Sequence, residues 1–199
     1  MSQLQQRPRW NCSRVGPRSM RERSVEWIKS GGGPLVCLET ALAHRWRGVE
    51  VGGGTTVDPK INAVSDYERA CRVPDYLGTI DLEEGSALVL GDMPLETSVW
   101  SDALKNIIIV RLFYIEPETD VSNLLQNIGD SSFINPQESI IFETRSSRLI
   151  IFDSAFPGDD QKKNILRFQL SKGKYRILTG LINPDSRTSL LLHKFYPLM

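Results

Sequence analysis

The feature that most limits how this chain can fold is a run of three glycines and a proline, residues 31–34, set between two apolar segments. A phosphate-binding loop needs a helix directly after its glycines, and the P-loop also needs Lys followed by Ser or Thr. Here Pro34 leads into Leu-Val-Cys-Leu, which is typical of a strand, and Val36 stands where the dinucleotide-binding pattern has its last glycine. The run therefore predicts a turn that bends a β-ribbon of residues 25–29 and 35–39 back on itself, with no anion docked against its amides.

Apolar segments separated by turn residues continue along the chain and predict further strands. Residues 106–115 contain four consecutive β-branched residues, which is typical of a central strand covered on both faces. Residues 139–143 and 148–153 are predicted to form a hairpin, and residues 164–170 and 174–182 flank a predicted turn. The remaining predicted strands are 77–82, 86–92 and 188–196. The sequence thus predicts an α+β fold that is mostly β, with antiparallel sheets of about nine strands and two or three short helices.

Short helices are predicted in three places. Ser65, followed three residues later by Glu68, forms a capping box, and Asp66 lies in the first turn, where the helix dipole favours a negative charge. Residues 117–129 carry apolar side chains at helical spacing, and residues 39–46 form a third candidate.

The chain has 199 residues and no formal net charge, but its charges are unevenly placed. Residues 1–24 contain six arginines and one acidic residue without periodicity, which predicts a disordered basic extension. Residues 25–199 are predicted to form a single domain, in which acidic side chains outnumber basic ones by five. Three widely spaced cysteines without a CxxC motif, and no apolar run of about 18 residues, predict a cytoplasmic protein with no transmembrane helix.

Residues that could carry catalysis or bind a metal are few and scattered. The two histidines, His44 and His193, are far apart, and no group of Cys, His or acidic residues has the spacing of a zinc or calcium site. Cys71 could pair with either histidine, but it lies on the predicted apolar face of its helix, which is typical of a small buried side chain. We therefore expect no metal, no cofactor and no enzymatic activity. A small-ligand-binding β module and a Cys-dependent enzyme remain as alternatives.

Three tryptophans, Trp27, Trp46 and Trp100, lie beside glycine turns or loops. Large rings in such places are most often buried anchors of the core. The alternative is that Trp100 is an exposed anchor for a binding partner. The acidic segment 153–160 is expected to be a solvated turn after a strand.

Six short motifs occur in order along residues 25–196, and together they resemble one family. The motifs comprise Trp27 with Gly32, Gly33 and Pro34; Trp46 with Gly48; Asp66, Tyr67, Arg69, Ala70 and Cys71; Gly91, Asp92 and Pro94 after Leu88; Asp153 with Ala155; and Gly173 with Tyr175. In these motifs the chain resembles immunity protein 21 of bacterial polymorphic toxin systems. It departs from that family in its basic extension, in a glycine-rich insertion near 52–56, and in Arg111-Leu-Phe, where an Arg-Trp pair is expected.

The resemblance implies a mostly β protein, made beside a toxin gene, that binds and neutralises a cognate toxin protein domain. It implies neither catalysis nor a small-molecule cofactor. The lack of a long apolar run and the acidic body of the chain predict binding neither to a membrane nor directly to nucleic acid. A cationic nuclease is one class of toxin that would suit the mildly acidic body of the chain. The expected contacts lie in the loop 47–62 and the acidic turn, and the candidate residues are Asp58, Trp100, Asp159 and Asp160. The family motif residues are expected to determine the fold instead, through turn chemistry and an Asp66–Arg69 ion pair.

Overall fold

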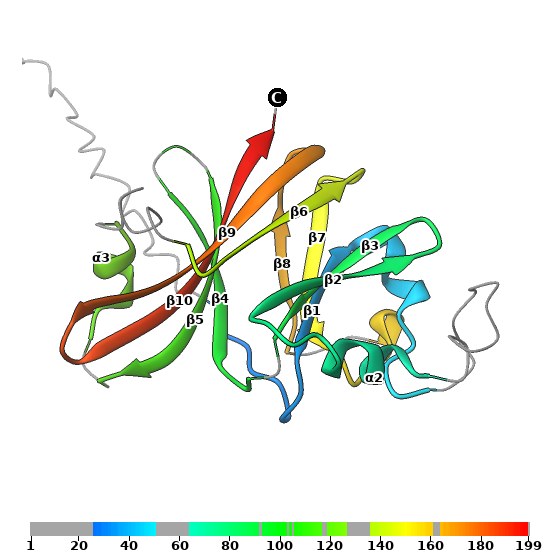
Figure 1. Ribbon diagram of the computed structural model, residues 1–199, viewed down its shortest axis with the longest axis horizontal. Coiled ribbons are helices and arrows are strands. Elements are labelled where there is room, and N and C mark those ends of the chain that lie inside the picture. The colour runs from blue at the N-terminus through cyan, green and yellow to red at the C-terminus, as the bar shows by residue number, and fades with distance from the viewer. Residues whose placement is uncertain are drawn as a thin grey trace, which may run out of the picture.

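The computed structural model describes residues 26–50, 64–91, 93–102, 104, 106–116, 119–126, 136–160 and 164–198. These residues form two five-stranded antiparallel sheets that lie side by side in Figure 1 and share a core. The predicted basic extension 1–24, Asp58 with most of the predicted loop 47–62, and Asp92 fall outside the described residues.

The strand order is β2-β3-β1-β7-β8 in the first sheet and β4-β5-β10-β9-β6 in the second. The first sheet contains β1 (Leu35–Glu39), β2 (Leu77–Leu82), β3 (Gly85–Leu90), β7 (Arg148–Asp153) and β8 (Leu166–Gln169). The second contains β4 (Glu96–Ser101), β5 (Ile107–Ile115), β6 (Glu138–Thr144), β9 (Gly173–Asp185) and β10 (Thr188–Leu198). The helical elements are η1 (Thr40–Arg45), α2 (Asp66–Cys71), α3 (Val121–Gln126) and η3 (Gly158–Asp160). The fold is therefore mostly β, as predicted, with ten strands in the described part of the chain.

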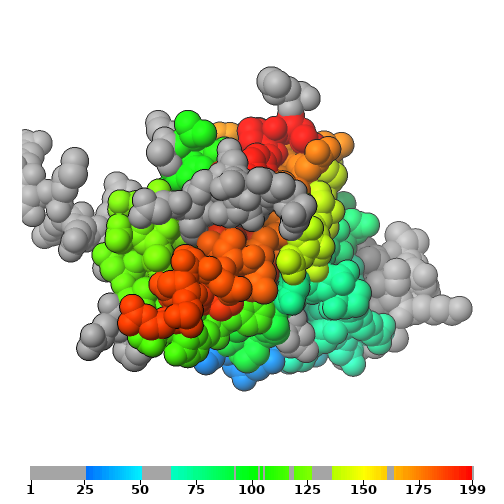
Figure 2. All heavy atoms as spheres, turned by 60° about the vertical axis from the view of Figure 1, so that its left-hand side comes forward, coloured from blue at the N-terminus to red at the C-terminus, as the bar shows by residue number. Residues whose placement is uncertain are grey.

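Strand β5 lies between β4 and β10, and both of its faces are covered, as its continuous apolar run predicts. Ile107 and Ile109 belong to the core shared by the two sheets. Ile108 and Val110 belong to a cluster on the opposite face, together with Leu125 of α3. Figure 2 shows this side of the molecule, where α3 (yellow-green) lies beside the β9–β10 hairpin (orange).

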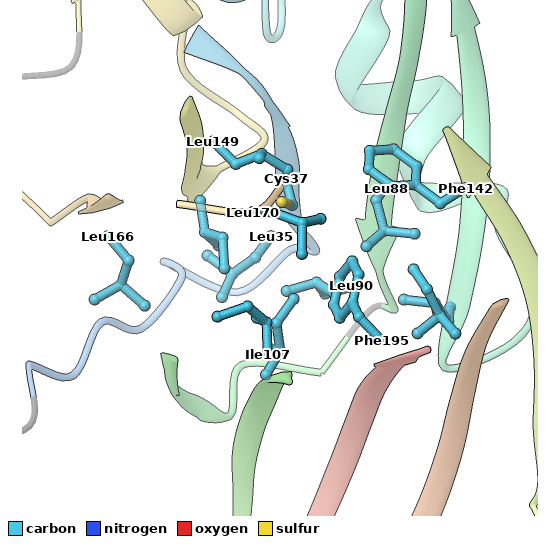
Figure 3. Packing of buried hydrophobic residues seen from close by; sticks show 14 of the residues in the cluster. Leu35, Cys37, Leu88, Leu90, Ile107, Phe142, Leu149, Leu166, Leu170 and Phe195 are labelled. Carbon is cyan, nitrogen blue, oxygen red and sulfur yellow. The ribbon is translucent and has the colours of Figure 1, made fainter. Parts of the chain in front are cut away.

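The core between the sheets takes side chains from both of them (Figure 3). Leu35 and Cys37 of β1 face the second sheet, where the rings of Phe142 and Phe195 meet edge to face with centroids 6.5 Å apart. Burial raises the pKa of the Cys37 thiol. This cysteine therefore stays protonated and acts as a small apolar side chain.

The glycine run does not form the predicted hairpin. Ile28 makes a single antiparallel bridge with Thr97 of β4 in the second sheet, whereas Leu35 begins β1 in the first sheet. Residues 29–34 therefore carry the chain from one sheet to the other, and the described residues 26–29 form no strand with 35–39. Gly32 has a φ of 143°, a conformation that favours glycine, and the following proline leads directly into β1 without a helix.

The predicted hairpin of 139–143 with 148–153 is also absent, although both strands exist. Strand β6 pairs with β9 in the second sheet, while β7 pairs with β1 and β8 in the first. The corner between them is fixed by the Arg145 N–H, which donates to the buried carboxylate of Glu39 at 2.7 Å. The predicted turn between β8 and β9 is likewise a crossing between sheets. Apolar periodicity locates strands, but it does not say which strands pair.

Several polar side chains are buried within the second sheet. Arg111 is fully buried, and its Nη2 donates to the carbonyl of Met93 at 2.6 Å, while its Nε and Nη1 have no hydrogen-bond partner among the described residues. Burial lowers the pKa of Arg111 to about 10. His193, opposite Ile109 in register, shares a hydrogen bond of 3.0 Å between its Nδ1 and the Thr179 hydroxyl. Burial, and then the nearby Arg111 charge, hold the pKa of His193 well below its usual range.

This burial predicts that His193 makes the fold acid-sensitive. The unfolded imidazole takes up a proton as the pH falls below about 6.5, but the folded one does not, so stability is lost as the pH decreases from that value. One such proton lowers the free energy of unfolding by up to about 1.4 kcal/mol per pH unit. His193→Gln, which keeps a partner for Thr179, should remove this slope in urea denaturation between about pH 6.5 and pH 5. An unchanged slope in the variant would show that His193 is not the responsible group.

Candidate partner-binding surface

Trp46 joins two segments that lie more than a hundred residues apart in sequence. Its side chain is fully buried, and its Nε1–H donates to the carbonyl of Ser154 at 2.9 Å. In return, the N–H of Gly158 donates to the Trp46 carbonyl at 2.9 Å. The segment after η1 and the segment after β7 are therefore held together by main-chain and indole hydrogen bonds. In Figure 1 these cyan and yellow-orange segments lie next to one another near α2.

The glycine crossing, residues 29–34, is hydrogen-bonded to the same segment after β7. Ser154 donates to the Pro34 carbonyl from both its hydroxyl, at 2.6 Å, and its N–H, at 3.1 Å. Asp153 accepts from the Gly31 N–H at 2.6 Å and from the Ala155 N–H at 3.0 Å. The prediction that no anion docks against the glycine amides is therefore wrong for Gly31, because the chain's own Asp153 carboxylate fills that role.

We call the interlocked segments 31–34, 46–48 and 153–158 the frame. Helix α2 is attached to the frame by the residues of its first turn. Ser65 accepts from the Glu68 N–H at 3.2 Å, and the Glu68 carboxylate accepts from the Ser65 N–H at 3.0 Å, so the predicted capping box is present. The bonds to Ser65 lower the pKa of Glu68. Asp66 accepts from the Arg47 N–H at 2.8 Å and forms the expected ion pair with Arg69 at 3.1 Å.

Two contacts of Tyr67, one through its main chain and one through its ring, complete the frame. The N–H of Tyr67 donates to the carbonyl of Gly48 at 3.0 Å. The Tyr67 ring lies so close to Gly33 that a Cβ there would fall 2.6 Å from it. Residues 46–48, the start of α2 and the glycine crossing are therefore one interlocked unit.

Gly48 is the position in the frame where the addition of one methyl group should lower the free energy of unfolding most. Its φ is 63°, in the left-handed region, and an added Cβ would meet the main chain of Ala155 and Phe156. Gly48→Ala should therefore lower the free energy of unfolding by about 1–3 kcal/mol in urea denaturation. In Gly31→Ala the new Cβ would lie 3.5 Å from the Asp153 carboxylate, an ordinary contact, so this control should change stability by less than about 0.5 kcal/mol. Equal costs for both variants would contradict this account of Gly48.

The frame presents two large apolar side chains to solvent. Val49 and Phe156 are each 56% exposed, and the Val49 N–H donates to the carbonyl of Ala155 at 3.1 Å, which places their main chains side by side. Exposed acidic residues lie close by in sequence: Glu50 after Val49, and Asp159 and Asp160 in η3. We call Val49, Glu50, Phe156, Asp159 and Asp160 the frame surface. The two loops singled out separately in the sequence, 47–62 and the acidic turn, thus approach one another where they are described.

Trp100 lies elsewhere in the fold. It is half-buried on β4 and belongs, with Trp27, to the cluster on the face of the second sheet that is turned away from the first. In the segment before β4, the Gly91 N–H donates to the Tyr76 carbonyl at 2.9 Å. The structure therefore does not bring Trp100 to the frame surface.

The structure offers no support for Cys71 chemistry with His193. Cys71 lies on α2 beside the first sheet, whereas His193 is enclosed in the second sheet and bonds Thr179 through one ring nitrogen. Its other ring nitrogen has no hydrogen-bond partner among the residues that the structure describes. His44 is exposed on η1. Within the described residues no group of three metal-ligating side chains is found, and no helix is long and apolar enough to cross a membrane.

Sequence reasoning missed Val49 and Phe156 as candidate contacts. Each is an apolar residue in a glycine-containing loop, Gly-Val-Glu-Val-Gly and Ser-Ala-Phe-Pro-Gly, and that is the signal that could have found them. Apolar residues in loops are common, however, so the signal is weak without the structure.

Comparison with known proteins bears on the chain as a whole. No curated protein and no solved structure matches it significantly. The sequence profile of one family, described as immunity protein 21, matches residues 26–188, which covers every strand of both sheets except β10, of which it includes only Thr188. The match includes every element of the frame described above. The chain therefore belongs to the immunity protein 21 family.

Proposed function

We propose that this chain is a cytoplasmic immunity protein that binds a cognate toxin domain and neutralises it by tight protein–protein association, without catalysis and without a cofactor. The observation that carries the proposal, beside the family, is the frame surface. Val49 and Phe156 lie on a unit that buried hydrogen bonds hold in place. Their exposed apolar surface does not stabilise the fold of the isolated protein. Exposed apolar groups with a polar rim are typical of protein interaction sites.

The rigidity of the frame favours tight binding. Association costs free energy when loops and side chains must be ordered, and residues already held in place avoid much of that cost. Val49 is held by its bond to Ala155, and the segment bearing Phe156 is held by Trp46 and Gly158. A buried aromatic anchor surrounded by polar contacts is the usual form of an interface hot spot.

The acidic rim of the frame surface favours a basic partner. Asp159 and Asp160 are exposed in η3, and Glu50 is paired at 2.9 Å with Arg47. Negative charge around an apolar centre accelerates the encounter with a cationic protein more than it strengthens the final complex. We therefore propose a basic toxin domain, such as a cationic nuclease, as the partner. Reversing the charges of Asp159 and Asp160 should slow association at low salt.

A small-ligand-binding function is less well supported. A groove of about 550 Å³ opens between the two sheets. None of the buried side-chain polar atoms that lack a partner in the described part of the chain, such as those of Arg111, Glu138 and His193, belongs to its lining. Ligand sites usually aim a few such polar groups into the cavity.

The proposed function is tested by growth. The toxin is identified by co-purification with the chain from its native cells and by mass, and it is then expressed alone or with the chain in a test strain. Co-expression should restore growth, and the two proteins should elute as one complex. If growth inhibition persists although the chain is soluble and abundant, the proposed function is wrong.

A further inference from the structure

An acidic groove of about 310 Å³ opens where the turn between β2 and β3 meets the corner between β6 and β7. Its charged lining residues come from β1, from the β2–β3 hairpin and from that corner: Glu39, Asp81, Glu83, Glu84, Glu143 and Arg145. All of them, and the residues on either side of each in sequence, belong to the described part of the chain. Carboxylates thus dominate this acidic groove.

Glu39 is the one buried residue of this charged lining, with 6% of its surface exposed. It follows Cys37 by two residues on β1, so its side chain faces the second sheet at the end of the shared core. One oxygen of its carboxylate accepts from the Arg145 N–H at 2.7 Å. The other oxygen is reached from the acidic groove and accepts no hydrogen bond from a described residue.

The negative charge of Glu39 has no cationic partner within the described part of the chain. A buried carboxylate is normally paired with a cation, because its burial otherwise costs free energy. Arg45 at the rim pairs instead with Glu83 and Glu84, each at 2.9 Å. The Arg145 guanidinium donates to the Glu84 carbonyl at 3.4 Å. The acidic groove therefore ends on a buried charge that the described residues leave unbalanced.

A second carboxylate lies in the same row of the first sheet. Asp81 is opposite Ser86 in the β2–β3 register, and the β1–β3 register, continued by two residues, places Ser86 opposite Glu39. Among the described residues no three metal-ligating side chains come close enough together to hold a metal ion. Carboxylates spread along a row suit a larger cation, and a planar guanidinium with five donors can bond to two of them at once.

One short helical element joins the acidic groove to the frame. The element η1 begins directly after Glu39 and ends at Arg45, which precedes Trp46. Its six residues span about 12 Å, whereas a standard interface covers about 800 Å² of each partner. It also lies beside η3, which carries two residues of the frame surface (Figure 1). A partner bound at the frame surface can therefore reach the acidic groove.

We propose that the acidic groove receives an arginine side chain of the toxin, whose guanidinium pairs with Glu39 and Asp81. The inference rests on the toxin-binding function proposed above and names a chemical feature of the partner. A guanidinium is more weakly hydrated than an ammonium ion, so it suits a buried carboxylate better than lysine does. The pairing supplies the cation that Glu39 lacks in the free chain. A desolvated pair acts mainly on the dissociation rate, whereas exposed charges act mainly on association.

The first test compares Glu39→Gln with Glu96→Gln in surface plasmon resonance against the identified toxin domain. Glutamine keeps the shape of Glu39 and an acceptor for the Arg145 N–H but removes the charge. Glu39→Gln should weaken binding at least about tenfold, mainly through faster dissociation, and the loss should persist at about 0.5 M NaCl because a buried pair is little screened. Glu96 is exposed on β4, so its variant removes the same charge outside the acidic groove and should keep wild-type affinity.

The second test is a double-mutant cycle that identifies the partner group. Each arginine of the toxin domain is replaced in turn with glutamine. One of these toxin variants should bind the wild-type chain about tenfold more weakly and should lose little further affinity against Glu39→Gln, because both changes remove the same pair. The urea midpoint of free Glu39→Gln should not fall, since the wild type already carries this charge without a cation. A lower midpoint with unchanged binding would give Glu39 a structural role only.

The remaining outcomes overturn the inference in different ways. Equal affinity of the wild type and Glu39→Gln would show that the toxin does not use the acidic groove, while toxin binding stands. Coupling to a toxin lysine alone would contradict the choice of a guanidinium. Tighter binding by Glu39→Gln would show that a competing cation, such as the basic residues 1–24, occupies the acidic groove. Should Glu39→Gln fail to fold, Asp81→Asn, at an exposed position of the same row, takes its place in both tests. If no toxin binds the chain at all, the proposed function fails first.

Discussion

Replacing Trp46 with alanine is expected to lower the free energy of unfolding by about 3–5 kcal/mol. The side chain is fully buried, its cluster includes residues of β1, β3 and β7, and its indole N–H satisfies the Ser154 carbonyl. Removing it leaves a cavity and a buried carbonyl without a donor, and both are costly. Urea denaturation followed by far-UV circular dichroism measures the loss. A cost below about 1 kcal/mol, typical of a surface position, would contradict the assignment of Trp46 as the centre of the frame.

Trp46→Phe separates the two causes. Phenylalanine keeps most of the apolar contact but cannot donate to Ser154, so its cost should be about 1–3 kcal/mol and clearly below that of alanine. If the two variants lose equal stability, the hydrogen bond outweighs the packing. If Trp46→Phe costs nothing, the bond contributes little and the frame is held by apolar contact alone.

Replacing Phe156 with aspartate is expected to weaken binding to the toxin domain by at least about 30-fold, or about 2 kcal/mol. Phe156 is 56% exposed, so the free protein should keep its stability to within about 0.5 kcal/mol. In the complex, the substitution removes an aromatic anchor and buries a charge without a partner. Surface plasmon resonance should show the loss mainly as faster dissociation.

Ile141→Asp is the matched control for this prediction. Ile141 is another exposed apolar residue, 47% accessible on β6 of the second sheet. The Ile141→Asp variant should bind the toxin with wild-type affinity. If Ile141→Asp weakens binding and Phe156→Asp does not, the toxin docks on the second sheet, and the frame surface is not the contact.

The sequence was sufficient to locate most elements of this fold. The continuous apolar run of β5 predicted a strand with two covered faces, and Ser65 with Glu68 predicted the start of α2. Strand β4 was not predicted, because Glu96–Ser101 contains four polar residues and no clear alternation of apolar and polar side chains.

Strand partners were harder to predict than strands. Short connections favour pairing of consecutive strands, so β6 with β7 was the natural expectation. In the structure the Arg145–Glu39 bond turns the chain to the other sheet at that corner. Glu39 and Arg145 are about a hundred residues apart, and the local sequence around each of them gives no signal that predicts this hydrogen bond. The glycine crossing was mistaken for a hairpin turn for the same reason.

The candidate surface could be predicted only in part. Charge and turn composition pointed to the acidic turn with Asp159 and Asp160, and lack of periodicity pointed to the loop from residue 47. Their proximity depends on the Trp46 and Gly158 contacts, which bridge distant segments and so cannot be read from local patterns. Val49 and Phe156 became candidate contact residues only because the structure shows both of them exposed on the frame.

The most direct test of toxin neutralisation by binding is a calorimetric titration of the purified chain with its catalytically inactivated toxin domain. The account predicts one toxin bound per chain, with a Kd of about 10 nM or tighter, as complexes of standard interface size reach when they contain good anchors. A titration without heat at several temperatures, or a Kd weaker than about 10 μM, would contradict it.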